Sequence, residues 1–190
     1  MEVKNILIVG VGGQGTLLAS KLMGKCFLQQ GFDVKVSEVH GMSQRGGSVV
    51  TYVRYGEKVY SPVIEKGEAD IIISFEQLES ARWLPYLKKG GVLISSTQKI
   101  DPMPVIMGKA VYPENILERI AAKGVKTVAV DALEKALEAG TARCANIVLL
   151  GAAARFLGTD KEMWLDIIKS TVPPKTVETN LRAFESGFNA

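Results

Sequence analysis

A glycine-rich turn between a short apolar strand and a helix is the feature that most constrains the fold of this chain. Ile6-Leu7-Ile8-Val9 is a continuous run of aliphatic residues, which is typical of a parallel strand covered on both faces. It leads into Gly10-Val11-Gly12-Gly13-Gln14-Gly15, after which apolar residues recur at helical spacing until Gly31. Residues 33–38 then alternate like a second strand. This order predicts a right-handed βαβ unit.

The remainder of the chain predicts an α/β fold with one interruption. Residues 48–55 and 59–64 alternate on either side of a Gly56-Glu57-Lys58 turn, which indicates an antiparallel hairpin inserted after the second strand. Further strands are expected at 69–75, 92–95, 110–112 and 125–130, and helices at 76–88, from near 113, 132–139, 143–158, 160–170 and from 173 to 188. We therefore expect a single domain over residues 1–190 with a Rossmann-like, mostly parallel sheet, helices on both faces, the inserted β-hairpin and C-terminal helices.

Composition argues against several classes of protein. A hydrophobic content of 47% supports a folded core, and the net charge of +3 is dispersed, so nucleic acid is not an expected partner. The start, Met1-Glu2-Val3-Lys4, runs into the first strand and does not resemble a signal peptide. The most apolar later stretch, residues 145–154, is too short to cross a bilayer. We expect a cytoplasmic protein that does not bind a membrane.

Cysteine and histidine are too scarce for a metal centre. The two cysteines, Cys26 and Cys144, are too few for an iron–sulfur cluster and lack the C-x-x-C spacing of zinc or redox sites. His40 is the one histidine, and spacing pairs it with neither a carboxylate nor a nucleophile. The sequence therefore predicts no metal site and assigns no catalytic residue.

The first candidate site is the glycine turn itself. Gly10, Gly12 and Gly15 fit G-x-G-x-x-G in the context in which that motif binds the phosphates of a nucleotide. Glu38 follows Gly15 by 23 residues and ends the second strand, where an acid that binds a ribose would lie. The candidate anion or nucleotide loop comprises Gly10, Gly12, Gly13, Gln14, Gly15 and Glu38. The alternative is that the glycines only allow a tight turn and that Glu38 is a solvated strand end.

A second candidate site follows directly on Glu38. The segment His40-Gly41-Met42-Ser43-Gln44-Arg45-Gly46-Gly47 is polar and glycine-rich, and it lies where the sheet would present a ligand beyond the ends of its strands. Arg45 beside two glycines suits an anion, because a guanidinium and backbone N–H groups can converge there. We predict a partner or ligand loop made of His40, Met42, Ser43, Gln44, Arg45, Gly46 and Gly47. The alternative is that Arg45 caps a turn and His40 makes ordinary loop hydrogen bonds.

Four stretches, taken together, resemble one known family. They are Gly10–Gly15, Glu38–Ser48, Asp70–Phe75 and Cys144–Gly151. In this combination the chain resembles the gamma subunit, or gamma-type domain, of 2-oxoacid:ferredoxin oxidoreductases, over about residues 3–188. The segment His-Gly-Met-Ser-Gln-Arg-Gly-Gly is most similar to the corresponding segment in the beta subunit of indolepyruvate ferredoxin oxidoreductase.

The resemblance implies a cofactor-free subunit of a complex that oxidatively decarboxylates a 2-oxoacid, an aryl pyruvate such as indolepyruvate, to an acyl-CoA. Thiamine diphosphate and iron–sulfur clusters would lie on larger companion subunits, CoA would enter the complex, and ferredoxin would accept the electrons. The low cysteine count agrees with this division. Two other interpretations stay open: a self-sufficient oxidoreductase that binds NAD or FAD through the first loop, and a ligand-binding adaptor on a Rossmann-like scaffold.

Overall fold

The chain forms a six-stranded sheet flanked by helices. The computed structural model describes residues 2–39 and 47–190, so the candidates His40, Met42, Ser43, Gln44, Arg45 and Gly46 lie outside the described residues. The strands are β1 (Lys4–Val11), β2 (Asp33–Val39), β3 (Ser48–Gly56), β4 (Ala69–Ser74), β5 (Leu87–Ser96) and β6 (Lys126–Val130). The helices are α1 (Thr16–Gln29), α2 (Gln77–Trp83), α3 (Met103–Ile106), α4 (Ile116–Ala121), α5 (Ala132–Ala139), α6 (Ala145–Ala154), α7 (Lys161–Thr171) and α8 (Val177–Phe188).

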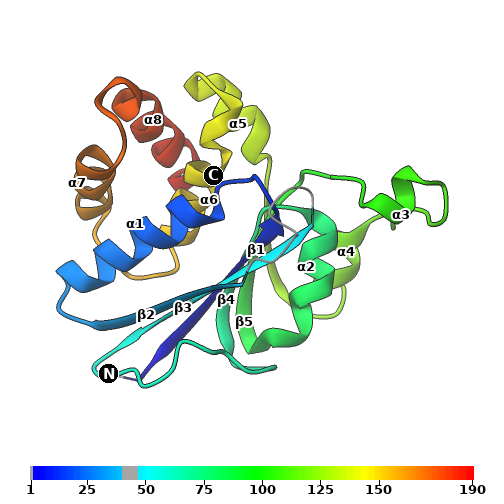
Figure 1. The fold of residues 1–190 in the computed structure, drawn as a ribbon, viewed down its shortest axis with the longest axis horizontal. Coiled ribbons are helices and arrows are strands. Elements are labelled where there is room, and N and C mark those ends of the chain that lie inside the picture. Colours follow the sequence, from blue (N-terminus) through cyan, green and yellow to red (C-terminus); the bar gives the residue numbers. More distant parts are fainter. Residues whose placement is uncertain (1, 40–46) are drawn as a thin grey trace.

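The sheet has the order β2-β3-β1-β4-β5-β6, and only β3 runs against its neighbours (Figure 1). β1, β4, β5 and β6 pair in parallel, with Ile6 opposite Ile71 and Val92 opposite Lys126. β3 pairs antiparallel with both β1 and β2, with Gly10 opposite Val49. The predicted Rossmann-like, mostly parallel sheet is confirmed, with one antiparallel strand between its first two strands.

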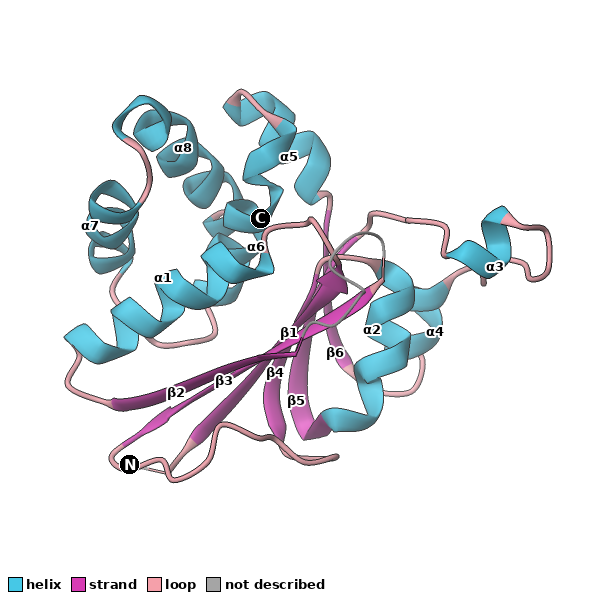
Figure 2. Cartoon of the chain, in the orientation of Figure 1, coloured by secondary structure: helices cyan, strands magenta, loops and turns pink. Residues whose placement is uncertain are grey.

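Alternate residues of β1 point to two different cores. Ile6 and Ile8 are buried on the face covered by α1, α5, α6, α7 and α8, which we call the first face (Figure 2). Leu7 and Val9 are buried on the opposite face, where α2 and α4 pack, which we call the second face. Period-two burial in a strand with helices on both sides is what the continuous apolar run predicted.

On the first face, α6 and α8 touch backbone to backbone. A Cβ added to Gly151 would lie 2.1 Å from the carbonyl oxygen of Phe184, and one added to Gly187 would lie 1.9 Å from that of Val148. Real Cβ atoms do not approach an oxygen so closely, so each glycine is required by its neighbour helix. Burial is complete around this contact, with Trp164 and Phe184 at 0% exposure.

The second strand of the predicted hairpin does not form. Residues 59–64 contain no strand, and β3 pairs with β2 and β1 instead. Pro62 has no N–H to donate to a ladder, and the guanidinium of Arg54 binds the carbonyls of Ser61 and Val63 at 3.0 and 2.8 Å. The side chain of Ile64 is buried in the second core. This segment is therefore held by side-chain contacts, and not by the backbone strand pairing that the sequence predicted.

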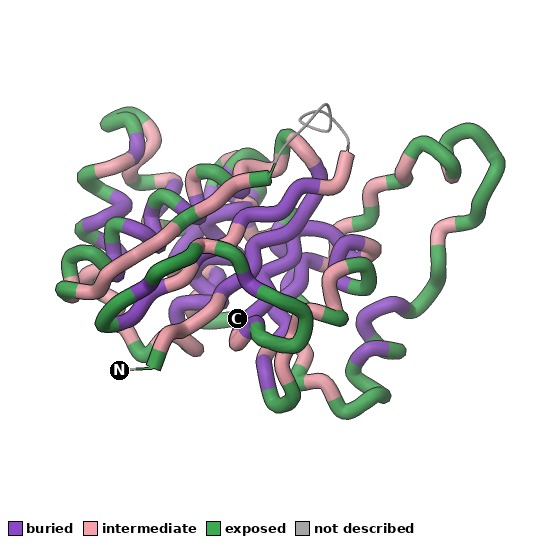
Figure 3. The backbone as a smooth tube through the Cα atoms, turned by 60° about the horizontal axis from the view of Figure 1, so that its bottom comes forward, coloured by how far each residue is buried: buried purple, intermediate pink, exposed green. Residues whose placement is uncertain are grey.

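Two other sequence-based boundaries also differ. The helix expected over residues 76–88 ends at Trp83, because Pro85 follows and the chain passes through a 3-10 turn into β5. The strand expected at residues 110–112 is wrong, since this stretch belongs to an excursion from the sheet that extends from Lys99 to Pro113. We call residues 99–113 the arm. Figure 3 shows it leaving the body of the protein as a largely exposed excursion.

Candidate functional site

The glycine loop lies at the carboxyl end of β1, and contacts within the protein already require several of its glycines. Gly13 and Gly15 have φ angles of 102° and 84°, in the left-handed region that favours glycine. A Cβ on Gly10 would lie 2.8 Å from Oε1 of Gln14 and 2.9 Å from Cβ of Phe75. The glycine motif therefore has a structural cause that does not depend on a ligand.

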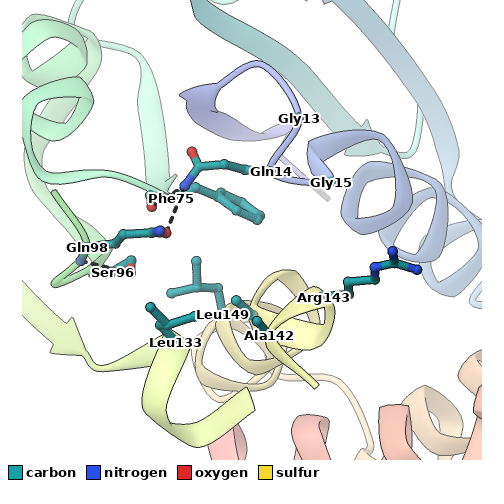
Figure 4. A pocket seen from close by; sticks show the side chains of 11 residues that line it. Gly13, Gln14, Gly15, Phe75, Ser96, Gln98, Leu133, Ala142, Arg143 and Leu149 are labelled. Carbon is teal, nitrogen blue, oxygen red and sulfur yellow. Dashed lines mark hydrogen bonds between the residues drawn. The ribbon is translucent and has the colours of Figure 1, made fainter. Parts of the chain in front are cut away.

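The side chain of Gln14 braces the loop from within. Its Oε1 accepts the N–H of Val11 at 2.7 Å. Its Nε2 donates to the carbonyl of Phe75 at 2.9 Å and to Oε1 of Gln98 at 3.1 Å (Figure 4). Phe75 follows β4 and Gln98 follows β5, so one side chain connects the ends of three strands. Gln14 thus fixes the shape of the site, with both amide protons in use.

Helix α1 begins at the loop with backbone donors that suit an anion. Gly15 is its N-cap, no side chain caps it, and its first turn carries no acidic residue. Within the described part of the chain, no acceptor bonds the amides of Gly13, Gly15, Thr16 or Leu17. A helix N-terminus with unused N–H groups carries a partial positive charge and attracts negative ligands.

Two pockets flank the loop. The first, of about 320 Å³, is lined by Gly13, Gln14, Gly15, Phe75, Ser96, Gln98, Leu133, Ala142, Arg143, Ala145 and Leu149 (Figure 4). The second, of about 350 Å³, is lined by Gly12, Gly13, Gly15, Thr16, Leu17, Val49 and Thr51. Both lie beyond the carboxyl ends of parallel strands, at the point where the chain leaves β1 and β4 toward opposite faces. Open α/β sheets bind ligands at such a point.

Two residues at or just before the start of α6 lie beside the glycine loop or its first pocket, and the sequence analysis identified neither of them. Asn146 is buried, its Nδ2 donates to the carbonyl of Gly15 at 3.2 Å, and its Oδ1 accepts the N–H of Ile147 at 2.9 Å. Arg143 is exposed just before α6, where it lines the first pocket, and its guanidinium points away from Gln14 and Gln98 (Figure 4). No ion pair joins Arg143 to another described residue. In the sequence, only the family-like stretch from Cys144 to Gly151 pointed to this region, and that stretch did not indicate which ligand binds there.

Glu38 lies farther from the loop than the dinucleotide interpretation assumes. β3 separates β2 from β1, and Glu38 pairs with Thr51 rather than with a residue of β1. Two strand spacings place β2 about 10 Å from β1. Oε1 of Glu38 accepts the hydroxyl of Ser20 at 3.2 Å, and the residue lines neither pocket. The role of Glu38 as a ribose ligand stays a prediction. Its distance from the glycine loop and its hydrogen bond to Ser20 favour a structural role.

The second predicted segment joins the same edge of the sheet. Val39 ends β2 and Ser48 begins β3 opposite Val11, so both ends of the segment lie at the carboxyl end of β1. The one described member of the predicted loop, Gly47, accepts the N–H of Gly12 through its carbonyl at 2.9 Å. This hydrogen bond connects the two candidate motifs.

A pair of buried carboxylates at the start of α2 was missed by sequence reasoning. Glu76 is 1% exposed, and Oε2 accepts the N–H of Glu79 at 2.9 Å while Oε1 accepts the N–H of Ile100 at 3.2 Å and the hydroxyl of Tyr112. Glu79 accepts the hydroxyl of Ser48 and the Nε–H of Arg82. Burial, followed by the bond to Glu76, raises the pKa of Tyr112, so its hydroxyl remains a proton donor. Nothing in a run ending Ser-Phe-Glu-Gln signals such a cluster.

The cysteines are not arranged for chemistry. Cys26 and Cys144 are free and buried. Burial raises the pKa of Cys26 to about 11 and also raises that of Cys144, so both stay protonated near neutral pH. Among residues 2–39 and 47–190, no group of three or more His, Cys, Asp or Glu side chains is placed to hold a metal ion. No helix in the same ranges is long and apolar enough to cross a bilayer.

Comparison with known proteins places this geometry in one family. The family model described as pyruvate ferredoxin/flavodoxin oxidoreductase matches residues 5–190. The chain belongs to this family. It is 46% identical to the indolepyruvate oxidoreductase subunit IorB of Thermococcus kodakarensis, over 100% of this chain and 96% of that protein. The resemblance inferred from the motifs is thereby confirmed.

Solved structures agree on the fold. The gamma subunit of a keto/oxoacid ferredoxin oxidoreductase from Geobacter sulfurreducens matches with a TM-score of 0.73 and 27% identity, over 98% of this chain and 96% of that one. A 2-oxoglutarate:ferredoxin oxidoreductase from Magnetococcus marinus, described with 2-oxoglutarate, coenzyme A and succinyl-CoA bound, matches with a TM-score of 0.77 and 19% identity. That match covers 100% of this chain and 31% of the other, so there a domain of this fold is part of a longer chain.

Proposed function

We propose that this chain is a subunit of a 2-oxoacid:ferredoxin oxidoreductase whose substrate is an aryl pyruvate such as indolepyruvate. The observation that carries the proposal is 46% identity over all of this chain and 96% of an indolepyruvate oxidoreductase subunit. The complex decarboxylates the 2-oxoacid, joins the acyl group to CoA and passes the electrons to ferredoxin. Residues 1–190 act within it as a single gamma-type domain, in the cytoplasm.

Thiamine diphosphate and the iron–sulfur clusters belong, in this proposal, to larger companion subunits. The whole sequence holds two cysteines, against the four thiolates that ligate a typical cluster. Both are buried on separate elements, Cys26 in α1 and Cys144 just before α6. This chain supplies a surface to the complex and a pocket at its edge, and none of its residues is assigned a step in the chemistry.

The glycine loop is proposed as the anion-binding part of that surface. Backbone amides at the start of α1, the neighbouring Arg143 and a pocket of about 320 Å³ fit a phosphate group. CoA is the first candidate because the proposed reaction consumes it. NAD, FAD or a carboxylate of a companion subunit share the chemistry. The loop from His40 to Gly47 is proposed to face the same ligand or partner, with Arg45 as its cation.

Reconstitution tests the proposal. The chain is purified alone and with the larger subunit of its own complex, and reduction of ferredoxin or a viologen dye by indolepyruvate and CoA is measured. We expect activity from the complex and none from the isolated chain. Activity of the isolated chain, or stoichiometric NAD or FAD bound to it, would favour the self-sufficient oxidoreductase instead. A chain that binds a ligand yet never joins the larger subunit would favour the adaptor.

Gly12→Ala tests the loop. Gly12 has no positive φ, so the backbone tolerates alanine, and Gly12 lines the second pocket, so the substitution adds a methyl group to a lining residue. Gly24→Ala is the matched control, because its Cβ would meet only Val36 Cγ2 at 3.9 Å. We expect Gly12→Ala to weaken CoA binding by calorimetry at least tenfold and the control to leave it unchanged. If wild type binds none of CoA, NAD or FAD and Gly12→Ala assembles normally, the loop is only a turn.

A further inference from the structure

The arm, residues 99–113, exposes a row of apolar side chains that neither core uses. Met103, Ile106, Met107 and Val111 are 61%, 65%, 56% and 88% exposed. None of them belongs to the two hydrophobic clusters. Figure 1 shows α3 and its turn projecting from the body beside α2 and α4. An exposed apolar group of this kind in a folded protein marks a contact with another surface.

The arm has a defined shape of its own. The amides of Val105, Ile106 and Met107 bond to carbonyls of Pro102 and Met103. Those of Lys109 and Ala110 return to the carbonyl of Pro104 at 2.8 and 3.1 Å. The amides from Val105 to Ala110, at the tip of the arm, are therefore bonded within the arm itself. A tip that already has this local structure needs less ordering when it binds, which favours affinity.

A buried carboxylate fixes the two ends of the arm to the body. Glu76 accepts the N–H of Ile100 at the start of the arm and the hydroxyl of Tyr112 at its end. The Tyr112 hydroxyl oxygen also accepts the N–H of Leu78 at 3.1 Å, and Nζ of Lys99 lies 5.9 Å above the Tyr112 ring. The apolar tip is thus presented from a pinned base.

We propose that the arm docks into an apolar groove on the larger subunit of the oxidoreductase. This inference rests on the proposed function, which supplies the partner. The arm and its flank carry Lys99, Asp101, Lys109 and Glu114, whose charges cancel, so its contact is apolar rather than electrostatic. Its hydrophobic side chains are of the kind that fill a partner's pocket and exclude water.

The position of the arm favours the larger subunit over a second copy of this chain. Pro102 and Met103 line a pocket of about 210 Å³ together with Gly47, Ser48 and Glu79. The base of the arm is therefore next to the sheet edge that holds both candidate motifs. In the proposed function, that edge faces the larger subunit. In the Magnetococcus marinus enzyme, moreover, a domain of this fold is joined to the rest of the enzyme in one chain.

Charge placed at the tip tests the inference. Ile106→Asp and Val111→Asp are compared with Tyr60→Asp, which lies outside the arm and is 89% exposed, close to Val111 at 88%. Binding of each variant to the purified larger subunit is measured by interferometry, with thermal melting to check folding. We expect each arm variant to bind at least about tenfold more weakly and Tyr60→Asp to bind like wild type. Arm variants that fold and bind like wild type overturn the inference.

Trypsin cleavage after Lys109 gives an independent measurement on the unaltered chain. Lys109 is exposed between Met107 and Val111, so we expect cleavage there in the isolated chain and protection in the complex. Equal cleavage in both states overturns the inference. So does an isolated chain that is a dimer and becomes monomeric with Val111→Asp, because the occupant is then a second copy. If wild type does not bind the larger subunit at all, the proposed function fails and the docking site with it.

Discussion

Both faces of the sheet cover an apolar core, but the segments that pack on them are held by different kinds of contact. On the first face, apolar helices pack so closely that Gly151 and Gly187 allow contact between the backbones of α6 and α8. On the second face, α2 and α4 leave room for two segments without long helices, residues 57–67 and the arm. Polar side chains fasten these segments: Arg54 and Asp33 hold the former, and Glu76 holds the latter.

The two kinds of contact serve different purposes: close packing stabilises the fold, and polar anchoring leaves a segment exposed for contact with another surface. Close apolar packing holds helices and strands firmly, but it buries both contacting surfaces, so neither is available to a partner. A buried polar group holds a segment by a few directed bonds and leaves the outer side of that segment free. The second face can therefore display the apolar tip of the arm beside its own smaller core, whereas the first face holds the larger apolar core.

The largest effect is expected from Gly151→Ala on the first face. A methyl group there would lie 2.1 Å from the carbonyl oxygen of Phe184, so α6 and α8 must separate. We expect the free energy of unfolding to fall by about 3 kcal/mol or more, measured by urea denaturation. Gly24→Ala, also within a helix but with a Cβ that would meet only Val36 Cγ2 at an ordinary contact distance of 3.9 Å, should raise stability by about 0.5–1 kcal/mol. Equal effects of the two variants would show that the helices are not in close contact.

A smaller loss is expected from Glu76→Gln on the second face. The amide keeps the shape of the carboxylate but presents an N–H₂ group to donors, leaving at least one buried donor without an acceptor. We expect a loss of about 2 kcal/mol in stability and faster trypsin cleavage of the arm at Lys109. Glu118→Gln on the exposed side of α4 is the control and should change neither. A Glu76→Gln variant with wild-type stability and unchanged cleavage would mean that the arm is not pinned there.

The smallest effect concerns pH and the segment at residues 57–67. Hydrogen bonds from Lys35 and from the N–H of Val59 lower the pKa of Asp33 to about 2. A carboxylate whose pKa is depressed on folding contributes stability above its ordinary pKa, and the contribution is lost as pH falls toward the folded value. Thermal melting of wild type should therefore decline from about pH 4 to about pH 2 more steeply than that of Asp33→Asn. Parallel profiles would contradict this.

The local part of the fold followed from the sequence. The run Ile6–Val9, the glycine turn and the helix after it are neighbours in the chain, so their pattern is visible in one window. The pairing of β3 could not be predicted in this way. Gly10 and Val49 are paired in the sheet but lie far apart in the sequence, and the alternating residues 59–64 looked like an equally good partner strand for β3. Pro62 gave the one local hint against that partner.

The candidate site was predictable to the same extent. The glycine loop is placed where its motif predicts, at the carboxyl end of β1. The ribose interpretation of Glu38 assumed that β2 lies beside β1, and the insertion of β3 removes that premise. Glu76, Gln98 and Asn146 come to the site from separate elements, and their importance arises from hydrogen bonds to distant groups that no spacing rule encodes.

The antiparallel insertion of β3 also bears on the order in which the sheet assembles. Val39 pairs with Val50, 11 residues later, whereas Ile6 pairs with Ile71, 65 residues later. Closing the longer loop costs about 1.5 kcal/mol more in chain entropy. The corner formed by β2 and β3 is therefore expected to nucleate before the parallel crossovers, which are intrinsically slow to form. In pulse-labelled hydrogen exchange during refolding, amides of β3 should gain protection ahead of those of β4 and β5, and the reverse order would exclude this route.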